Sequence, residues 1–202
     1  ELRRALEQLG SSNKWTKYFG LEKDIISKTK EGIYKIVLAV VELSKNKTGA
    51  LIVIERDIKL KEIISTGVTL NAEISPQLLV NIFTPNTPLH DGAVVIKDNK
   101  IAAAACMLPL ANDEDIAREL GTRHRAAIGM SKESDAIIIV VSEETGRISI
   151  AKEGTLIADL KEEAIKKILI SNIITKRFKE EDKTTILDRI KNIKNIRKKK
   201  AE

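Results

Sequence analysis

Hydrophobic positions near the start of the chain follow helical spacing and then strand spacing. Leucines at positions 2, 6 and 9 predict a short amphipathic helix, and residues 11–17 are expected to form a polar connector. A longer helix is predicted over Gly32–Lys45, where apolar side chains again recur at helical spacing. The apolar run Ala50–Ile54 that follows predicts a buried strand.

The next part of the chain is expected to lead from this strand into a helix. Residues 63–70 predict a loop and a short strand, and Gly67 is expected to adopt an unusual backbone conformation. Ser75 and Pro76 predict the start of a helix, because serine caps helix N-termini and proline fits the first turn.

The remainder of the chain alternates strands and helices. Two hairpins are predicted, one around Asp98-Asn99 and one around residues 143–146. Their strands are expected over Ala93–Lys97, Lys100–Leu108, Ala136–Ser142 and Arg147–Ala151. Helices are expected over residues 113–120, from Thr122 onward, and over residues 160–174 and 185–197. Because no βαβ unit repeats, the predicted fold class is mixed α/β, a central, largely antiparallel mixed β-sheet with helices on both faces.

The composition fits one domain with an aliphatic core. The 202 residues are 43% hydrophobic but only 3% aromatic. The single cysteine, Cys106, excludes a framework of disulfides within the chain, and its apolar surroundings favour a buried, inert thiol. No apolar stretch reaches the ~20 residues that cross a bilayer, and no signal peptide is visible.

The net charge of +6 lies in the C-terminal tail. From Lys176 onward the chain has 11 basic and 5 acidic residues, and the rest is balanced. A basic face for duplex nucleic acid is therefore not expected on the body, and no nucleic-acid partner is expected. The tail itself is either a solvated helical end or a segment that touches anionic lipid or nucleic acid.

The first candidate site is Leu89–Ala93, just before a predicted strand. Asp91 offers the hard oxygen ligand that Mg²⁺ and Mn²⁺ prefer. The small residues Gly92 and Ala93 leave room for a sugar or phosphate against the backbone. The alternative is a plain turn, since Asp-Gly is a common turn pair, with His90 as an ordinary loop histidine.

The second candidate site is Gly121–Arg125, at a predicted helix start. Thr122 is expected to cap a helix whose free N–H groups and positive dipole end attract an anion. Arg123 and Arg125, on either side of His124, can each bind phosphate through two hydrogen bonds. The alternative is a solvated basic turn. Basic side chains oppose the dipole at this end of a helix, however, and that conflict favours a binding role.

Two further segments lie at predicted strand ends. Residues Ser142-Glu143-Glu144 fit either a polar hairpin turn or part of a site. Met107-Leu108-Pro109 fit either the edge of the core or an apolar wall against a base. A metal-binding carboxylate together with a cationic cluster indicates nucleotide chemistry.

Three segments of the chain resemble, in order, the motifs of the diadenylate cyclase (DAC) domain family: Pro88–Ala93, Gly121–Ala127 and Val141–Gly146. The resemblance covers residues 39–150. Residues 1–10 are similar to the segment that follows the membrane helices in the membrane-anchored (CdaA) type of the family. The resemblance to the DAC family implies a metal-dependent enzyme, using Mn²⁺, Mg²⁺ or Co²⁺, that condenses two ATP into cyclic di-3′,5′-AMP and two pyrophosphates. Each protomer of a face-to-face homodimer is expected to hold one ATP.

The resemblance also implies roles for individual residues. Asp91, with His90, is expected at the metal, and Leu108 near adenine. Met107 stands where relatives can carry an aromatic residue. The implied catalytic residues are Asp91, Arg123, His124 and Arg125. The implied ATP-binding residues are Gly92, Ala93, Leu108, Gly121, Thr122, Arg123, His124, Arg125, Ser142, Glu143 and Glu144.

These expectations divide the chain into three segments. Residues 1–30 are expected to be a helix and linker that follow a membrane anchor missing from this chain, residues 31–175 the catalytic domain, and residues 176–202 a basic helical tail. The expected location is the cytoplasmic face of the cell membrane. Two other functions stay open, a non-catalytic module that senses adenine nucleotides and a nucleic-acid binder that acts through the tail.

Overall fold

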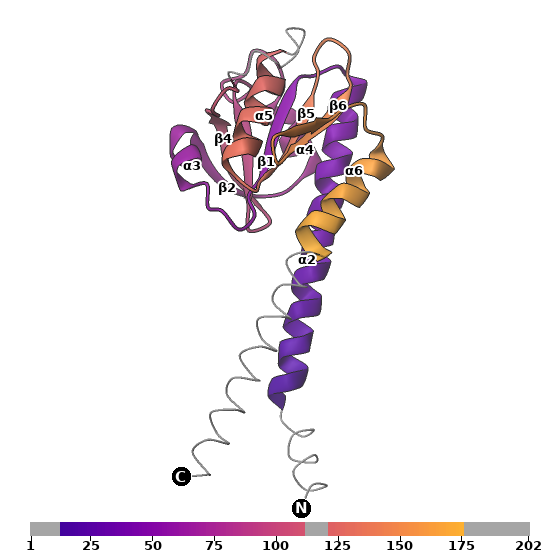
Figure 1. Ribbon diagram of the computed structural model, residues 1–202. Coiled ribbons are helices and arrows are strands. Elements are labelled where there is room, and N and C mark those ends of the chain that lie inside the picture. The colour runs from indigo at the N-terminus through magenta and orange to yellow at the C-terminus, as the bar shows by residue number, and fades with distance from the viewer. Residues whose placement is uncertain (1–12, 112–120, 176–202) are drawn as a thin grey trace, which may run out of the picture.

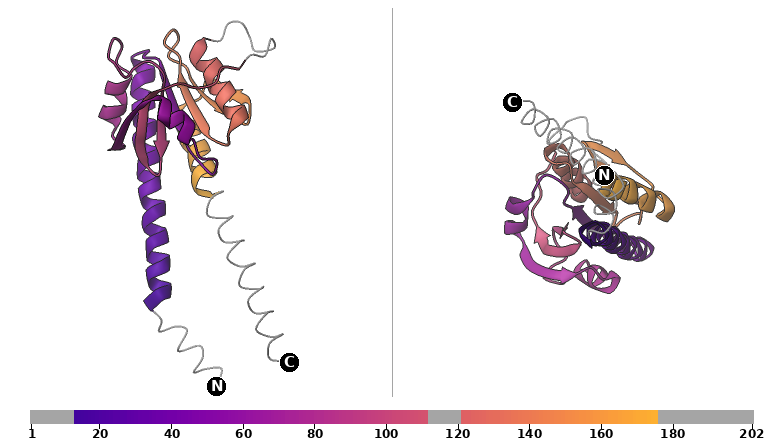
Figure 2. Two further views of the ribbon diagram at one scale, coloured as in Figure 1. Left: turned by 90° about the vertical axis from the view of Figure 1, so that its left-hand side faces the viewer. Right: turned by 90° about the horizontal axis from the view of Figure 1, so that it is seen from below.

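A seven-stranded mixed sheet with helices on both faces forms the body of the protein (Figures 1 and 2). The computed structural model describes residues 13–111 and 121–175, and their side chains from residue 24 to residue 174. The strands, in the order β2-β4-β3-β1-β5-β6-β7, are β1 (Ala50–Ile54), β2 (Val68–Glu73), β3 (Ala93–Lys97), β4 (Lys100–Cys106), β5 (Ile137–Val141), β6 (Ile148–Lys152) and β7 (Thr155–Ile157). The helices are α2 (Asn13–Lys45), α3 (Lys61–Thr66), α4 (Pro76–Ile82), α5 (Thr122–Glu133), α6 (Glu162–Leu169) and the π-helical segment η1 (Ile170–Thr175).

The core has two layers, one on each face of the sheet. On one face, side chains of α2, α4 and α6 pack against Ile52 and Ile139 of the central strands. On the other face, side chains of α5 pack against Leu51 and Val140. Because β1 and β5 are covered on both faces, they are continuous apolar runs and not alternating ones.

The sheet is mixed because β1 pairs in parallel with β3 and antiparallel with β5. Every other strand pair is antiparallel. The predicted fold class, a largely antiparallel mixed sheet with helices on both faces, is confirmed. Both predicted hairpins are present. Asp98 and Asn99, at φ 47° and 60°, form the two-residue turn between β3 and β4.

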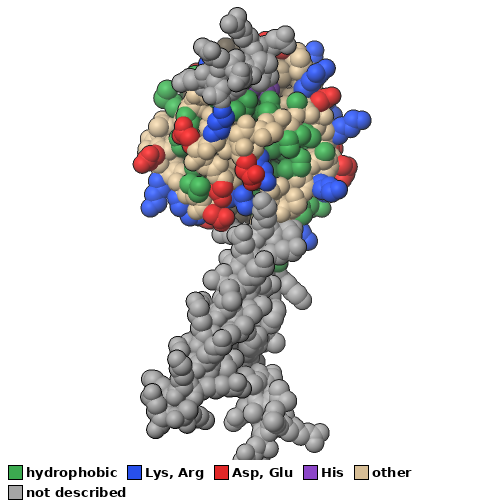
Figure 3. Space-filling model, in the orientation of Figure 1, with side chains coloured by type: hydrophobic (Ala, Val, Ile, Leu, Met, Phe, Trp, Pro, Cys, Tyr) green, Lys and Arg blue, Asp and Glu red, His purple; other side chains and the backbone are tan. Residues whose placement is uncertain are grey.

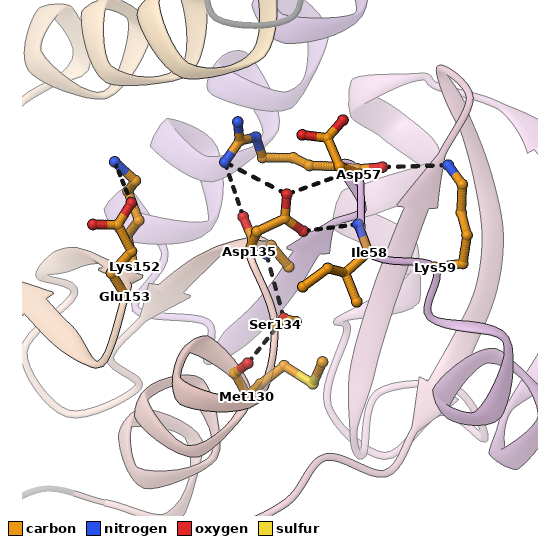
Figure 4. A network of polar contacts seen from close by, with 10 residues as sticks. Asp57, Ile58, Lys59, Met130, Ser134, Asp135, Lys152 and Glu153 are labelled. Carbon is orange, nitrogen blue, oxygen red and sulfur yellow. Dashed lines mark hydrogen bonds and ion pairs between the residues drawn. The ribbon is translucent and has the colours of Figure 1, made fainter.

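A polar cluster closes one edge of the sheet, where β1 ends and β5 begins (Figure 4). The Asp135 carboxylate accepts hydrogen bonds from the backbone N–H groups of Asp57 and Ile58, at 3.1 Å each. Arg56 Nη1 donates to the backbone oxygen of Asp135 at 3.1 Å. These bonds tie the chain that leaves β1 to the chain that enters β5, so the two central strands are fixed at this edge.

Helix α2 is longer than predicted. It begins at Asn13, so the polar connector expected over residues 11–17 is wrong for residues 13–17. No proline interrupts α2, and its two glycines, Gly20 and Gly32, do not end the helix. The N-terminal part of α2 projects beyond the body (Figures 1 and 2). The helix also crosses the predicted boundary between residues 30 and 31, and that division stays a prediction.

Other local expectations had mixed outcomes. The Ser75 cap is confirmed, since Leu78 N donates to Ser75 Oγ at 3.2 Å. Residues 61–66 form α3 where a loop was expected. Gly67 is extended, with φ −104°, and not unusual. Glycine is needed there for space, because a Cβ would lie 2.5 Å from Cys106 Sγ.

The C-terminal half adds one strand that the sequence did not predict, the three-residue β7. The helix expected over residues 160–174 is present as α6 and η1. Cys106 is buried as expected, and burial raises the pKa of its thiol to about 11. The helices expected over residues 2–9, 113–120 and 185–197 lie outside the described residues.

The surface of the body carries charges of both signs. Figure 3 shows positive and negative side chains interspersed over the visible face, in agreement with the balanced charge outside the tail. Within the described residues, no helix combines the length and the hydrophobicity that crossing a bilayer requires.

We expect the inner face of α2 to contribute strongly to stability. Leu43 is 1% exposed and packs in the core, whereas Leu38 on the same helix is 56% exposed. Leu43→Ala should lower the free energy of unfolding by about 3 kcal/mol, because it leaves a cavity. Leu38→Ala, the matched control, should change it by less than about 0.5 kcal/mol. Urea denaturation measures both values, and equal losses would contradict this packing of α2.

Candidate active site

The three motifs meet at the edge of the sheet opposite the Asp135 cluster. Ile52 of β1 pairs with Val94 of β3 on one side and with Ile139 of β5 on the other. Because β5 is antiparallel to β1, the end of β5 lies beside the starts of β1 and β3. Two strand spacings, about 10 Å, therefore separate the start of β3 from the end of β5. The first motif ends at the start of β3, and the third motif begins at the end of β5.

The first motif is a tight loop packed on β4. Gly92 has φ +102°, and a Cβ there would lie 2.8 Å from Cys106 O, so only glycine fits. His90 Nδ1 lies 2.6 Å from Thr87 O. A carbonyl oxygen only accepts hydrogen bonds, so Nδ1 carries the proton and Nε2 keeps a free lone pair.

Asp91 is exposed at the end of the first motif's loop. Its carboxylate makes no hydrogen bond or ion pair with any residue in the described ranges. Within the described residues, no three side chains of His, Cys, Asp or Glu lie together in a group that could hold a metal ion. Mg²⁺ commonly uses one or two carboxylates and completes its shell with water and substrate phosphates. The Asp91 carboxylate fits such a partial ligand set. His90 Nε2 is a nitrogen donor that suits a transition metal such as Co²⁺ better than Mg²⁺, and a carbonyl bond like that of His90 is typical of metal-binding histidines.

The second motif begins α5 without a side-chain cap. Gly121 is the N-cap, and Thr122 is the first helical residue, so the predicted Thr122 cap is wrong. Glycine is an acceptable N-cap because the position needs extended backbone, which Gly121 has at ψ 169°. No side chain caps this end of the helix. The backbone N–H groups of His124 and Arg125 donate to Gly121 O, at 3.1 and 3.2 Å, whereas those of Thr122 and Arg123 make no hydrogen bond within the described residues and can bind an anion.

An ion pair connects the second motif to the third. Arg123 Nη1 lies 2.5 Å from Glu143 Oε2, across the gap between α5 and the end of β5. Gly49, which precedes β1, lies directly beneath this pair. A Cβ at Gly49 would be 2.6 Å from Arg123 Nη1 and 2.9 Å from Glu143 Oε2. Sequence reasoning missed Gly49, because a lone glycine before a strand carries no signal of what will pack on it.

A pocket of about 310 Å³ opens beside this ion pair. Its lining consists of Gly121–His124 from the start of α5, Val141–Thr145 from the end of β5 and the turn after it, and Arg147, Ser149, Leu156 and Ala158 from β6, β7 and the residues next to them. The structure thus places seven of the predicted site residues around one pocket. The last four lining residues were not predicted, since β7 was not predicted and strand positions facing a pocket look like core positions.

The remaining predicted site residues do not line this pocket. Asp91, Gly92 and Ala93 lie at the same edge of the sheet, at the start of β3. Leu108 follows β4, in a loop held to α5 by the bond from Ala111 N to Arg125 O, at 3.2 Å. The loop at the end of β4 and the first motif are neighbours, because Ala93 pairs with Cys106.

His124 lies in a partly desolvated position on the pocket wall. Burial lowers the pKa of the His124 imidazole below its usual value, and the negative charge of Glu144 opposes this shift. The imidazole is therefore neutral near pH 7, and it can offer one N–H donor to a bound ligand.

Comparison with known proteins identifies the family. A family model described as DisA bacterial checkpoint controller nucleotide-binding (DAC) matches residues 37–156, and the chain belongs to this DAC family. The chain is 52% identical over 169 residues to cyclic di-AMP synthase CdaA of Bacillus subtilis, covering 84% of this chain and 61% of that protein. It is 51% identical over 175 residues to a diadenylate cyclase of Listeria monocytogenes, covering 87% of this chain and 63% of that protein. The chain thus spans about three fifths of the length of these curated relatives.

Two solved structures have a similar fold. The crystal structure of a double mutant of DacA from Staphylococcus aureus matches with a TM-score of 0.70 and 44% identity, over 71% of this chain and 96% of that one. A hypothetical membrane spanning protein from Bacillus cereus matches with a TM-score of 0.62 and 53% identity, over 63% of each chain.

The position of His124 predicts a specific dependence of stability on pH. Because the fold lowers the pKa of His124, the unfolded chain binds the proton first as the pH falls below about 6.5. The contribution of neutral His124 to stability is complete above that pH and is lost as the pH falls through the lowered pKa. His124→Gln should therefore lose less unfolding free energy than the wild type between about pH 7.5 and about pH 5, as measured by urea denaturation. Parallel pH profiles would contradict the lowered pKa.

Proposed function

We propose that this chain is the catalytic part of a diadenylate cyclase, which condenses two ATP into cyclic di-3′,5′-AMP and two pyrophosphates. The observation that carries the proposal is the meeting of three motifs at one edge of the sheet, beside a pocket at the uncapped start of α5. Membership of the DAC family supports it, as do relatives named cyclic di-AMP synthase and diadenylate cyclase.

The phosphates of ATP bind at the start of α5. The backbone N–H groups of Thr122 and Arg123, at the positive end of the helix dipole, bind an anion there, and the guanidinium groups of Arg123 and Arg125 add charge-assisted hydrogen bonds. The ion pair with Glu143 holds the Arg123 guanidinium in place. Thr122 and His124 complete the proposed phosphate-binding set, and Ser142 and Glu144 bind ATP at the edge of the site; all four line the pocket.

The nucleoside lies along the first motif and the end of β4. Gly92 and Ala93 let the ribose approach the backbone, and Leu108 packs against adenine. Asp91, assisted by His90 Nε2, holds a divalent cation, which is Mn²⁺, Mg²⁺ or Co²⁺. When bound, such an ion supplies positive charge that lowers the pKa of the 3′-hydroxyl and offsets charge on the phosphates.

The reaction requires two protomers that face one another. The 3′-oxygen of one ATP forms a bond to the α-phosphorus of the other as the bond to pyrophosphate breaks, and the reciprocal step closes the ring. Each chain presents one set of motifs at one edge of its sheet. A face-to-face homodimer therefore brings two ATP molecules into line, and this placement is its largest contribution to the rate.

The proposed segments and location follow from the family. Residues 31–175 form the catalytic domain, residues 1–30 connect it to a membrane anchor, and residues 176–202 form a basic tail. The enzyme then acts at the cytoplasmic face of the cell membrane. Its similarity to a protein described as membrane spanning supports this location.

Asp91→Asn tests the role of the first motif. This substitution should lower the rate of cyclic di-AMP formation by about 10²-fold or more, because a neutral amide binds a divalent cation poorly. Binding of ATP, measured by calorimetry without divalent metal, should change little. The matched control is Asp98→Asn in the hairpin turn at the far end of β3, where asparagine suits the left-handed backbone. Mass spectrometry of reactions with ATP and Mn²⁺, Mg²⁺ or Co²⁺ measures the product.

Two outcomes would overturn this assignment. Undiminished product formation by Asp91→Asn would remove Asp91 from the catalytic machinery. ATP binding by the wild-type protein, with no product at high protein concentration and with any of the three metals, would favour the non-catalytic nucleotide-sensing module instead.

The need for two protomers predicts a concentration effect. The rate per protein molecule should rise with protein concentration and then level off once the dimer predominates. Assays over a dilution series give the rate per protein molecule, and light scattering on the same samples gives the molecular mass. The rate and the mass are then compared as functions of protein concentration. A constant rate per molecule in a sample shown to be monomeric would contradict the face-to-face mechanism.

A further inference from the structure

The pocket extends beyond the three motifs, onto β6. Arg147, at the start of this strand, and Ser149 both line it. Side chains two residues apart on a strand point to the same face. Ala151, the next residue in this series, packs in the core layer beneath α5. Arg147 and Ser149 therefore face the side of the sheet on which α5 begins.

Ser149 is a buried residue whose hydroxyl has no partner among the described residues. The residue is 2% exposed, yet its side chain makes no hydrogen bond with any residue in the described ranges. No fully buried side-chain N or O atom lacks a partner among these residues, so the hydroxyl keeps its access to the pocket. Because this hydroxyl opens to the pocket, a ligand there can replace water as its hydrogen-bond partner. Ser149 therefore supplies a polar binding position on the pocket wall.

Arg147 brings a positive charge to the same pocket. Its backbone N–H donates to Thr145 Oγ1 at 3.2 Å, which fixes the turn before the strand. Its guanidinium pairs with no carboxylate within residues 24–111 and 121–174. The Arg123 guanidinium, in contrast, is already paired with Glu143. Arg147 thus offers its full charge and hydrogen-bonding capacity to a ligand in the pocket.

We propose that Arg147 and Ser149 bind the two terminal phosphates of ATP, which leave as pyrophosphate. This inference rests on the proposed cyclase function, and it assigns to these two residues a role that the three motifs leave open. The α-phosphate must stay near the first motif, because the reacting 3′-hydroxyl of the second ATP arrives at the outer edge. The terminal phosphates then extend past the start of α5 toward β6, where the pocket is lined by Arg147 and Ser149.

The chemistry of the step gives Arg147 a function beyond binding. As the 3′-oxygen bonds to the α-phosphorus, the bond from that phosphorus to the bridging oxygen breaks. Its electron pair stays on pyrophosphate, and the hydroxyl proton is released. Negative charge therefore grows on the leaving group in the transition state, and a fixed guanidinium stabilises it.

A pair of ligands that differ only in the terminal phosphates tests this inference. We would measure binding of 3′-deoxy-ATP and 3′-deoxy-AMP by calorimetry with Mg²⁺, since neither has the hydroxyl needed for turnover. Arg147→Gln should weaken binding of 3′-deoxy-ATP about tenfold or more, because a charge-assisted hydrogen bond is lost. Binding of 3′-deoxy-AMP should stay within about twofold of the wild-type value. Arg147→Lys should give an intermediate loss, and Ser149→Ala a smaller one in the same direction.

Lys61→Gln supplies the matched control. Lys61 is an exposed cation at the start of α3, far from the pocket lining, and the substitution removes the same charge. It should leave the affinities for both nucleotides unchanged, which separates a local contact from a general effect of net charge. Equal thermal stability of all variants would show that they fold.

The outcomes separate the two proposals. Equal affinity of Arg147→Gln and wild type for 3′-deoxy-ATP would overturn this inference and leave the cyclase function standing. A similar loss for both nucleotides would also overturn it, because the effect would not depend on the terminal phosphates. Failure of the wild-type protein to bind either nucleotide would reject the proposed function and this inference together.

Discussion

The pairing of β1 with two neighbours of opposite direction is the constraint on which the site depends. Since β3 runs parallel to β1 and β5 runs antiparallel, the start of β3 and the end of β5 lie at one edge of the sheet. Two segments about 50 residues apart in sequence are thereby brought within about 10 Å. The opposite edge, where Asp135 binds the chain leaving β1, holds these strands in register. A shift of one residue would move each side chain of β1 into the opposite core layer, and the close packing of these two different layers opposes it.

The sequence predicted those parts of the fold in which local chemistry decides the structure. The Asp98-Asn99 turn and the Ser75 cap were predicted and are confirmed, because each depends on side chains within a few residues. The start of α2 was predicted wrongly, because a polar segment without proline is compatible with both a connector and a helix. The strand β7 has three residues and exists only through its pairing with β6, so no local pattern reveals it.

The candidate site was predictable to a similar extent. Sequence reasoning selected the segments around Asp91 and Arg123 because they carry functional groups in unusual places, and the structure brings them to one sheet edge. The features missed are those created by tertiary contacts. Gly49 matters only because an ion pair lies on it. Ser149 looks like any strand residue until the fold places its hydroxyl at the pocket with no partner in the part of the chain that the structure describes.

The charges around the pocket explain why these additional residues matter. Arg123 is paired with Glu143, and the pKa of His124 is lowered by burial, so neither supplies a free positive charge near neutral pH. In the proposed site, the attraction for phosphate then comes from the uncapped first turn of α5, from Arg125 and from Arg147. A phosphate that enters near the ion pair can share Arg123 with Glu143, because a guanidinium has five N–H donors. The ion pair therefore keeps Arg123 in position without using all of its hydrogen-bonding capacity. In this arrangement Glu143 acts through Arg123, which is a positioning role.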